Sequence, residues 1–130
     1  MTNADLEILL VDQNKVDTAR LSEAIRGSVG IDSTSGEVVL ADGFGMLSAK
    51  NKLLVVLLGR LASTLLGRRQ DDRASVADLT ALTGMPAGTV GPAIRKLKTD
   101  RLVDQDPDKR YFVPRVKVIA ACDAAKEGRR

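Results

Sequence analysis

Apolar side chains recur at helical spacing in two short segments late in the chain, separated by a glycine turn. Ser75 is placed to cap the first helix, and Asp78 three residues later completes a variant of the capping box. Gly84 is placed for the left-handed residue that ends this helix, and Pro86 stands where a second helix, residues 87–99, can begin. The second helix has a narrow apolar stripe made of Val90, Ile94 and Leu97. Two short helices joined in this way are typical of a helix-turn-helix.

The longest apolar pattern lies upstream, over residues 47–66, and predicts a helix capped by Ser48. Residues 53–58 are all apolar, so the apolar surface is wider than one amphipathic stripe. We therefore expect this helix to be covered on two sides. The helix-turn-helix supplies one cover, and either the N-terminal residues or a second copy of the chain supplies the other.

The first 46 residues predict a small strand–helix–strand extension. Residues 5–11 have the apolar, branched character of a strand, and residues 15–27 read as a helix capped by Asn14. Small polar side chains predict a turn at residues 31–36, and residues 37–40 predict a second strand. Such a unit is too small to bury its own core, so it is expected to dock on the rest of the chain or on another subunit.

Two β-type segments, residues 102–103 and 111–113, flank an Asp-Pro-Asp turn at residues 106–108 and predict a β-hairpin. Of the two adjacent aromatic residues, Phe112 is expected in the core and Tyr111 partly exposed.

A terminal helix is predicted over residues 115–126, followed by a basic tail at residues 127–130. Its apolar positions are expected at Val116, Ile119, Ala120 and Cys122 or Asp123. Cys122 is interpreted as a small core residue rather than a reactive thiol.

The segment ADLTALTGMPAGTVGPAIRKLKTDRLV resembles the winged helix-turn-helix families of transcription regulators, and RLVDQDPDKRYFVP resembles their wing. The resemblance covers residue 47 to about residue 125. It implies an α+β fold, with a winged helix-turn-helix domain at residues 47–126 and the acidic extension at residues 1–46. Many relatives carry polar or basic residues after the Thr-Val pair, where this chain has Gly91 and Pro92. Backbone docking is therefore expected from these two positions rather than base reading.

Charge is unevenly placed along the chain, although the net charge is only +3. Residues 1–46 hold three basic against eight acidic side chains, and residues 91–130 hold eleven against six. The basic part is suited to an anionic partner, although charge runs also serve as solvated surface. Local pairing and phosphate contact remain alternatives for a mixed run of Arg68, Arg69, Asp71, Asp72 and Arg73.

Catalytic and metal chemistry find little support in the composition. The chain has no histidine, which removes the commonest general base and metal ligand, and its single cysteine allows neither a zinc site nor an internal disulfide. The Gly-Phe-Gly at residues 43–45 lacks the rest of a phosphate loop, and the aspartates at residues 104–108 lack the glycine and distal glutamate of a calcium loop. We expect no enzyme activity, no cofactor and no bound metal, and the single cysteine and lack of a signal peptide favour the cytoplasm.

The sequence favours a homodimeric regulator that binds double-stranded DNA, with helix 87–99 in the major groove and wing 104–110 on the backbone. The alternative is a winged-helix adaptor that binds protein instead. The candidate DNA contacts are Thr89, Arg95, Lys96, Lys98, Arg101, Lys109 and Arg110.

Overall fold

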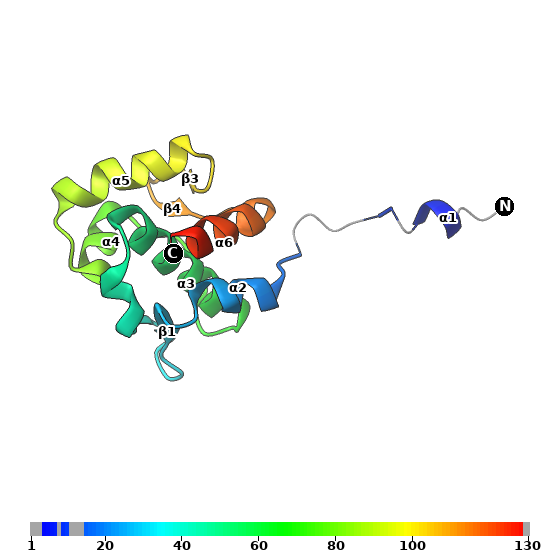
Figure 1. Ribbon diagram of the computed structural model, residues 1–130, viewed down its shortest axis with the longest axis horizontal. Coiled ribbons are helices and arrows are strands. Elements are labelled where there is room, and N and C mark those ends of the chain that lie inside the picture. The colour runs from blue at the N-terminus through cyan, green and yellow to red at the C-terminus, as the bar shows by residue number, and fades with distance from the viewer. Residues whose placement is uncertain (1–3, 8, 11–14, 129–130) are drawn as a thin grey trace.

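The computed structural model describes residues 4–7, 9–10 and 15–128 and shows a small α+β fold of helices with two short antiparallel hairpins (Figure 1). No described helix is long and apolar enough to cross a membrane. The elements in chain order are α1 (Ala4–Glu7), α2 (Thr18–Ile25), β1 (Val29–Ile31), β2 (Val38–Leu40), the 3-10 turn η1 (Asp42–Met46), α3 (Ala49–Leu65), α4 (Val76–Thr83), α5 (Ala87–Thr99), β3 (Asp104–Gln105), β4 (Tyr111–Phe112), the 3-10 turn η2 (Arg115–Lys117) and α6 (Val118–Glu127).

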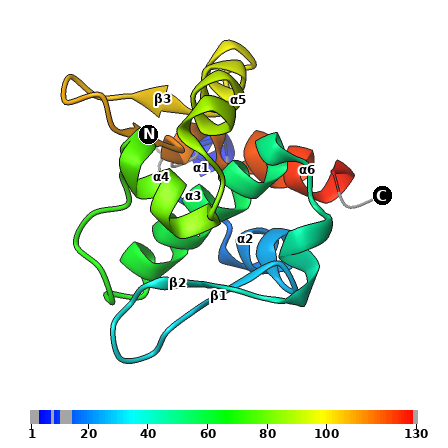
Figure 2. The same ribbon diagram turned by 90° about the vertical axis from the view of Figure 1, so that its left-hand side faces the viewer.

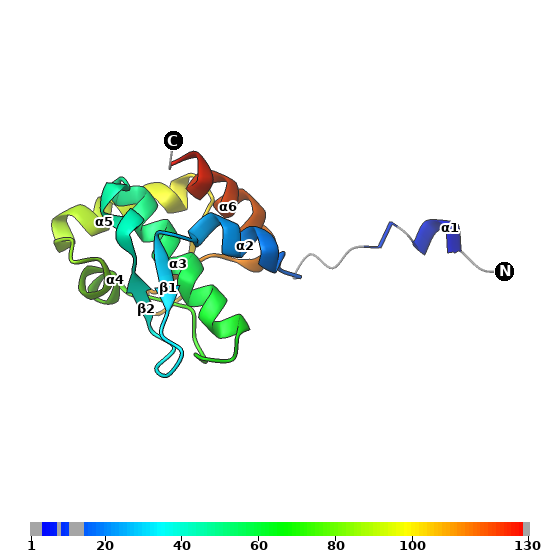
Figure 3. The same cartoon turned by 60° about the horizontal axis from the view of Figure 1, so that its bottom comes forward.

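Helix α3 runs through the centre of the fold. Ser48 caps it as predicted, accepting a hydrogen bond from the backbone N–H of Asn51. Every residue from 53 to 61 is buried, and α3 contacts α4 and α5 as well as α2, α6 and the β1–β2 hairpin (Figure 3). The two-sided cover is therefore confirmed, and the chain itself supplies both sides.

The two predicted helices α4 and α5 are present, and the predicted signals define their ends. Ser75 and Asp78 form a reciprocal capping box, and Gly84 ends α4 at φ 74°. Pro86 is the residue that precedes α5, and Val90, Ile94 and Leu97 are fully buried. These residues hold α5 against α3, which leaves the opposite face of α5 open.

The N-terminal prediction is wrong in its order of elements. Residues 4–7 form a helical turn rather than a strand, while Ile8 and Val11 lie outside the described residues. Helix α2 begins at Thr18 because the Asp17 carboxylate accepts from the backbone N–H of Arg20, at 3.1 Å. The expected cap, residue 14, also lies outside the described residues.

Both strands of this region follow α2 and form the β1–β2 hairpin, so the order is helix–strand–strand. The predicted turn is confirmed, because the Asp32 carboxylate accepts from the backbone N–H groups of Thr34 and Ser35. Gly36 completes the turn at φ 75°, and its carbonyl accepts from the Ser63 hydroxyl on α3 at 2.6 Å. The hairpin is thereby fixed to the central helix.

The β3–β4 hairpin is present, but its first strand lies two residues later than predicted. Val103 is fully buried and precedes the strand instead of belonging to it. Tyr111 is buried and exchanges backbone hydrogen bonds with Ala74, whereas Phe112 is half-buried under the guanidinium of Arg73. The core assignment of Phe112 is therefore wrong, because strand alternation directs residues 111 and 113 inward.

The terminal helix also has a different buried face from the predicted one. Val116 and Ile119 are exposed, and the buried residues are Val118, Ala121, Cys122 and Ala125. The initial 3-10 turn η2 shifts the helical phase, so a periodicity counted from residue 116 selects the wrong face. Cys122 is a core residue as predicted, and burial raises the pKa of its thiol to about 11.

Candidate nucleic-acid interface

Helix α5 and the β3–β4 hairpin lie together at one end of the molecule, and the β1–β2 hairpin lies at the other (Figure 2). The Lys98 ammonium donates to the Gln105 side chain at 3.3 Å and links α5 to β3. The outward face of α5 is polar and exposed over Thr89, Pro92, Arg95, Lys96 and Thr99. This face and the adjoining hairpin make up the outer surface, which bears all of the predicted contacts.

Three of the predicted cations on the outer surface are exposed and have neither an ion-pair partner nor a side-chain hydrogen bond within the described part of the chain. They are Arg95 on α5, Arg101 just after it, and Lys109 in the β3–β4 turn. Arg101 and Lys109 both have left-handed backbone conformations, with φ of 63° and 64°. Such cations are available to an anionic ligand without first giving up a carboxylate.

Gly91 and Pro92, which depart from the pattern of the regulators that the sequence resembles, occupy different environments. Gly91 is buried, and the Arg95 guanidinium lies 3.4 Å from the point where a Cβ on Gly91 would stand. Pro92 is exposed on the outer surface. The glycine therefore leaves room for Arg95 to lie along the helix, and only the proline replaces a possible base-reading side chain.

Lys96 is paired with the acidic residue at the end of its own helix. Asp100 lies 3.2 Å from the Lys96 ammonium and 3.3 Å from that of Lys50 on α3. Hydrogen bonds from Lys96 and then Lys50 lower the pKa of the Asp100 carboxyl. Exposed pairs of this kind contribute little to stability, so a phosphate group can compete for either lysine.

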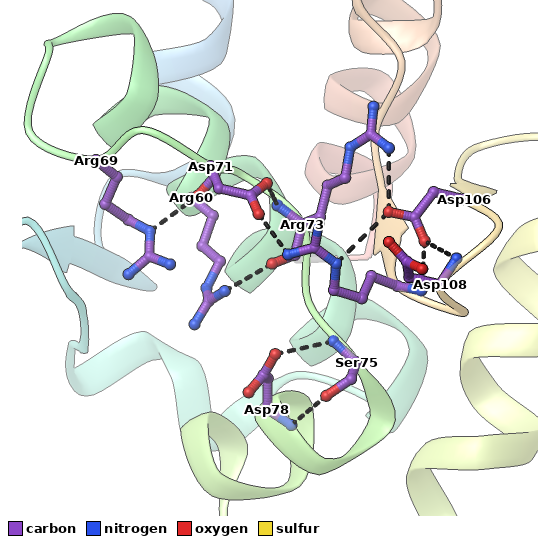
Figure 4. Close-up of polar contacts among 9 residues, drawn as sticks. Arg60, Arg69, Asp71, Arg73, Ser75, Asp78, Asp106 and Asp108 are labelled. Atoms are coloured by element: carbon purple, nitrogen blue, oxygen red, sulfur yellow. Dashed lines mark hydrogen bonds and ion pairs between the residues drawn. The ribbon is translucent and has the colours of Figure 1, made fainter.

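Arg110 differs from the other predicted contacts because it belongs to a network of carboxylates and arginines. Figure 4 shows Asp71, Arg73 and Asp106 of this network. It pairs with Asp71 in the loop before α4 and with Asp106 in its own hairpin. Arg73 lies 3.0 Å from Asp106, whose side chain is almost completely buried. We call Asp71, Arg73, Asp106 and Arg110 the hairpin clamp.

Backbone groups define the geometry of the hairpin clamp. The Asp106 carboxylate accepts from the N–H groups of Arg110 and Asp108, each at 2.9 Å. The Arg110 backbone bond is the largest cause of the lowered pKa of Asp106, and Arg73 adds to it. Local pairing thus accounts for Arg73 and for Arg69, which lies 2.6 Å from Glu37. The alternation of basic and acidic residues at 68–73 is the sequence signal for these pairs.

Arg60 is a buried cation beneath the hairpin clamp that sequence reasoning missed. Its guanidinium donates to the Arg73 carbonyl at 2.8 Å, and burial lowers its pKa. Its Nε has no hydrogen-bond partner among the described residues. The available signal was a charged residue inside the apolar part of a helix.

Two of the three acidic hairpin residues are paired with cations of the chain itself, whereas Asp108 is exposed. Asp104 lies 3.5 Å from the Lys117 ammonium, and Asp106 belongs to the hairpin clamp. Within the described ranges no three metal-ligating side chains come together. The Gly-Phe-Gly segment is a 3-10 turn with Phe44 buried in the core.

Comparison with protein-family models, curated proteins and solved structures found no match to this chain. The geometry of the outer surface is therefore the basis on which a function can be proposed.

Proposed function

We propose that this protein is a DNA-binding regulator in which residues 47–126 act as a winged helix-turn-helix. The observation that carries the proposal is a set of three exposed cations beside the polar face of α5, Arg95, Arg101 and Lys109, whose side chains have no partner among the described residues. Helix α5 enters the major groove with its N-terminal end first, and the β3–β4 hairpin lies on the backbone.

The candidate contacts divide into three roles. Thr89 lies in the first turn of α5, whose N-terminus also favours a phosphate. Arg95 reads a base edge, and Lys96 exchanges Asp100 for a phosphate or base edge. Lys98, Arg101 and Lys109 neutralise phosphates, while Arg110 holds the hairpin in place through the hairpin clamp.

The test is a binding titration with a random-sequence duplex at several salt concentrations. Affinity should fall linearly on a log–log plot, and Lys109→Ala should reduce the slope by about one unit. Arg68→Ala is a matched control, because Arg68 is exposed next to the β1–β2 hairpin at the opposite end of the molecule. It should leave the slope unchanged.

Arg95→Ala tests base reading once a preferred site has been selected from random duplexes. It should weaken binding to that site more than binding to random DNA, whereas Lys109→Ala should weaken both alike. Equal losses for Arg95→Ala would remove its base-reading role.

A protein-binding adaptor is the second candidate, and two observations favour it. Pro92 is exposed at the centre of the outer face of α5, and Asp100 compensates the charge of two nearby lysines. No binding to the duplex even at low salt would reject the DNA proposal and favour this one.

A further inference from the structure

Arg60 is a buried cation in the central helix α3. Only 7% of its surface is exposed, and the other residues from 53 to 61 are buried as well. No carboxylate of the described residues forms an ion pair with it, and its Nε–H has no hydrogen-bond partner among them. A buried charge without an opposite charge is costly, and a neutral side chain of similar length would avoid that cost. An offsetting contribution must come from what the guanidinium contacts.

The Arg60 guanidinium contacts the segment that precedes α4. Its Nη1 donates to the carbonyl of Arg73 at 2.8 Å (Figure 4). This carbonyl belongs to residues 71–74, which we call the anchor segment. Within the segment the Asp71 carboxylate accepts from the backbone N–H of Arg73 at 2.9 Å, so the two residues hold each other in place. One hydrogen bond from the core thereby fixes the anchor segment to α3.

The anchor segment carries three kinds of attachment to the β3–β4 hairpin. Asp71 and Arg73 supply its half of the ion pairs in the hairpin clamp. The Arg73 guanidinium also lies 4.2 Å from the centre of the Phe112 ring. Ala74 and Tyr111 exchange two backbone hydrogen bonds, at 2.9 Å and 2.7 Å. A shift of the anchor segment should therefore shift the hairpin with it.

We propose that Arg60 is a positioning residue for the β3–β4 hairpin. Its bond to the Arg73 carbonyl fixes the anchor segment and, through it, the place at which Lys109 meets a phosphate. The consequence for DNA binding rests on the proposed function, whereas the positioning of the hairpin does not. Helix α5 is held on α3 by its own buried apolar stripe, so Arg95 should keep its place when Arg60 is changed.

Arg60→Met is the variant that tests the proposal, because it removes the guanidinium and keeps an unbranched side chain in the core. Ser63→Ala is the matched control. Ser63 lies about one turn further along α3, is fully buried and also donates to a loop carbonyl, that of Gly36 beside the β1–β2 hairpin, at 2.6 Å. Arg60→Lys retains a charged donor and should restore the behaviour of the unmodified protein. Circular dichroism should show the same helix content for all of them.

Native-state hydrogen exchange follows the hairpin without any DNA. The backbone N–H of Tyr111 bonds to the anchor segment, and that of Arg110 bonds to the hairpin clamp. In Arg60→Met both should exchange about tenfold faster relative to the amides of α5, whereas Ser63→Ala should leave this ratio unchanged. An equal loss of protection in the hairpin and in α5 for Arg60→Met would mean that Arg60 supports general stability alone, and would overturn the proposal.

A double-mutant cycle based on the salt titration tests the consequence for DNA binding. Lys109→Ala should reduce the slope by about one unit in the unmodified protein and in Ser63→Ala, but by much less in Arg60→Met. Arg95→Ala should weaken binding to the selected site equally in all three backgrounds. A full effect of Lys109→Ala in Arg60→Met would overturn the link between the two residues. Absence of duplex binding by the unmodified protein would instead reject the DNA proposal, and hydrogen exchange would still decide whether Arg60 positions the hairpin.

Discussion

Whether a basic side chain is paired with a carboxylate determines how readily it can bind an anion. Arg95 and Lys109 have no acidic partner among the described residues, Lys96 shares Asp100, and Arg110 is held by two aspartates. The four cations contribute equally to a count of charge along the sequence. They differ in the free-energy cost of binding a phosphate, because a paired cation must first break its existing ion pair.

Asp100 provides a test of this distinction at the level of one residue. Asp100→Asn removes the carboxylate that pairs with Lys96 and Lys50, so both lysines become available and the outer surface gains one positive charge. We expect tighter binding to random duplex DNA and a salt slope steeper by about one unit. The measurement is the salt titration described above.

Glu37→Gln is the matched control for Asp100→Asn. It makes the same change in net charge and also releases a cation, Arg69, but near the β1–β2 hairpin. It should leave the salt slope unchanged. Equal steepening by both variants would mean that binding responds to total charge and not to the outer surface.

At the level of elements, the β3–β4 hairpin is short, and ion pairs hold it together with the buried side chain of Tyr111. Its strands have two residues each, so the ladder contributes few hydrogen bonds. The hairpin clamp joins it to the loop before α4, and Ala74 pairs with Tyr111 at its base. Ionised aspartates therefore contribute to its position beside α5.

Asp106→Asn should lower the midpoint of thermal unfolding by several degrees at pH 7. The lowered pKa of Asp106 means that its ionised form stabilises the folded state above its unfolded pKa of about 3.9. This contribution is lost as the pH falls through the still lower folded value. The difference between the variant and the unmodified protein should therefore shrink from about pH 4 downward. Thermal unfolding at a series of pH values measures it.

Asp108→Asn serves as the control, because Asp108 is exposed in the same turn and its backbone N–H, which remains, is the group bonded to Asp106. It should change the midpoint little at any pH. A constant difference for Asp106→Asn across the acid range would contradict the ionic role of the hairpin clamp.

The elements predicted correctly from the sequence are those specified by local chemistry. The capping box at Ser75, the left-handed Gly84 and the cap at Ser48 each act within a few residues, so their signals survive in any tertiary context. The strand expected at residues 5–11 rested on apolar, branched composition alone, which does not distinguish a strand from a short helix. The phase of α6 depended on a 3-10 turn that leaves little trace in the sequence.

In the candidate site, too, local sequence patterns predicted some features and missed others. Helical spacing identified the exposed face of α5 and placed Arg95 on it. It gave no sign that Arg110 contacts Asp71, which is 39 positions earlier in the chain. Pairing across such separations is set by the packed hairpin and loop, and one sequence does not encode it in any periodic pattern.

At the level of the whole molecule, α3 is the shared core of the N-terminal and C-terminal parts. The β1–β2 hairpin packs where α3 has Gly59, and methyl groups of Val38 and Val29 lie 3.2 Å and 3.4 Å from the place of a Cβ there. The opposite side of α3 supports α5. A substitution that destabilises the packing under the β1–β2 hairpin should therefore also destabilise α5, on the far side of the same helix.

Gly59→Val tests whether the fold is one cooperative unit. The added side chain collides with Val38 and Val29 and should destabilise the protein by about 1–3 kcal/mol, as overpacking does. Native-state hydrogen exchange should show an equal loss of protection for the slowest amides of β2 and of α5, because both exchange through the same global unfolding. Gly88→Val makes the same substitution in α5, where a new Cβ meets no other part of the described chain within 4 Å, and should change stability little. A loss of protection confined to the β1–β2 hairpin would instead divide the chain into two independently opening parts, in which α3 supports α5 without help from the hairpin.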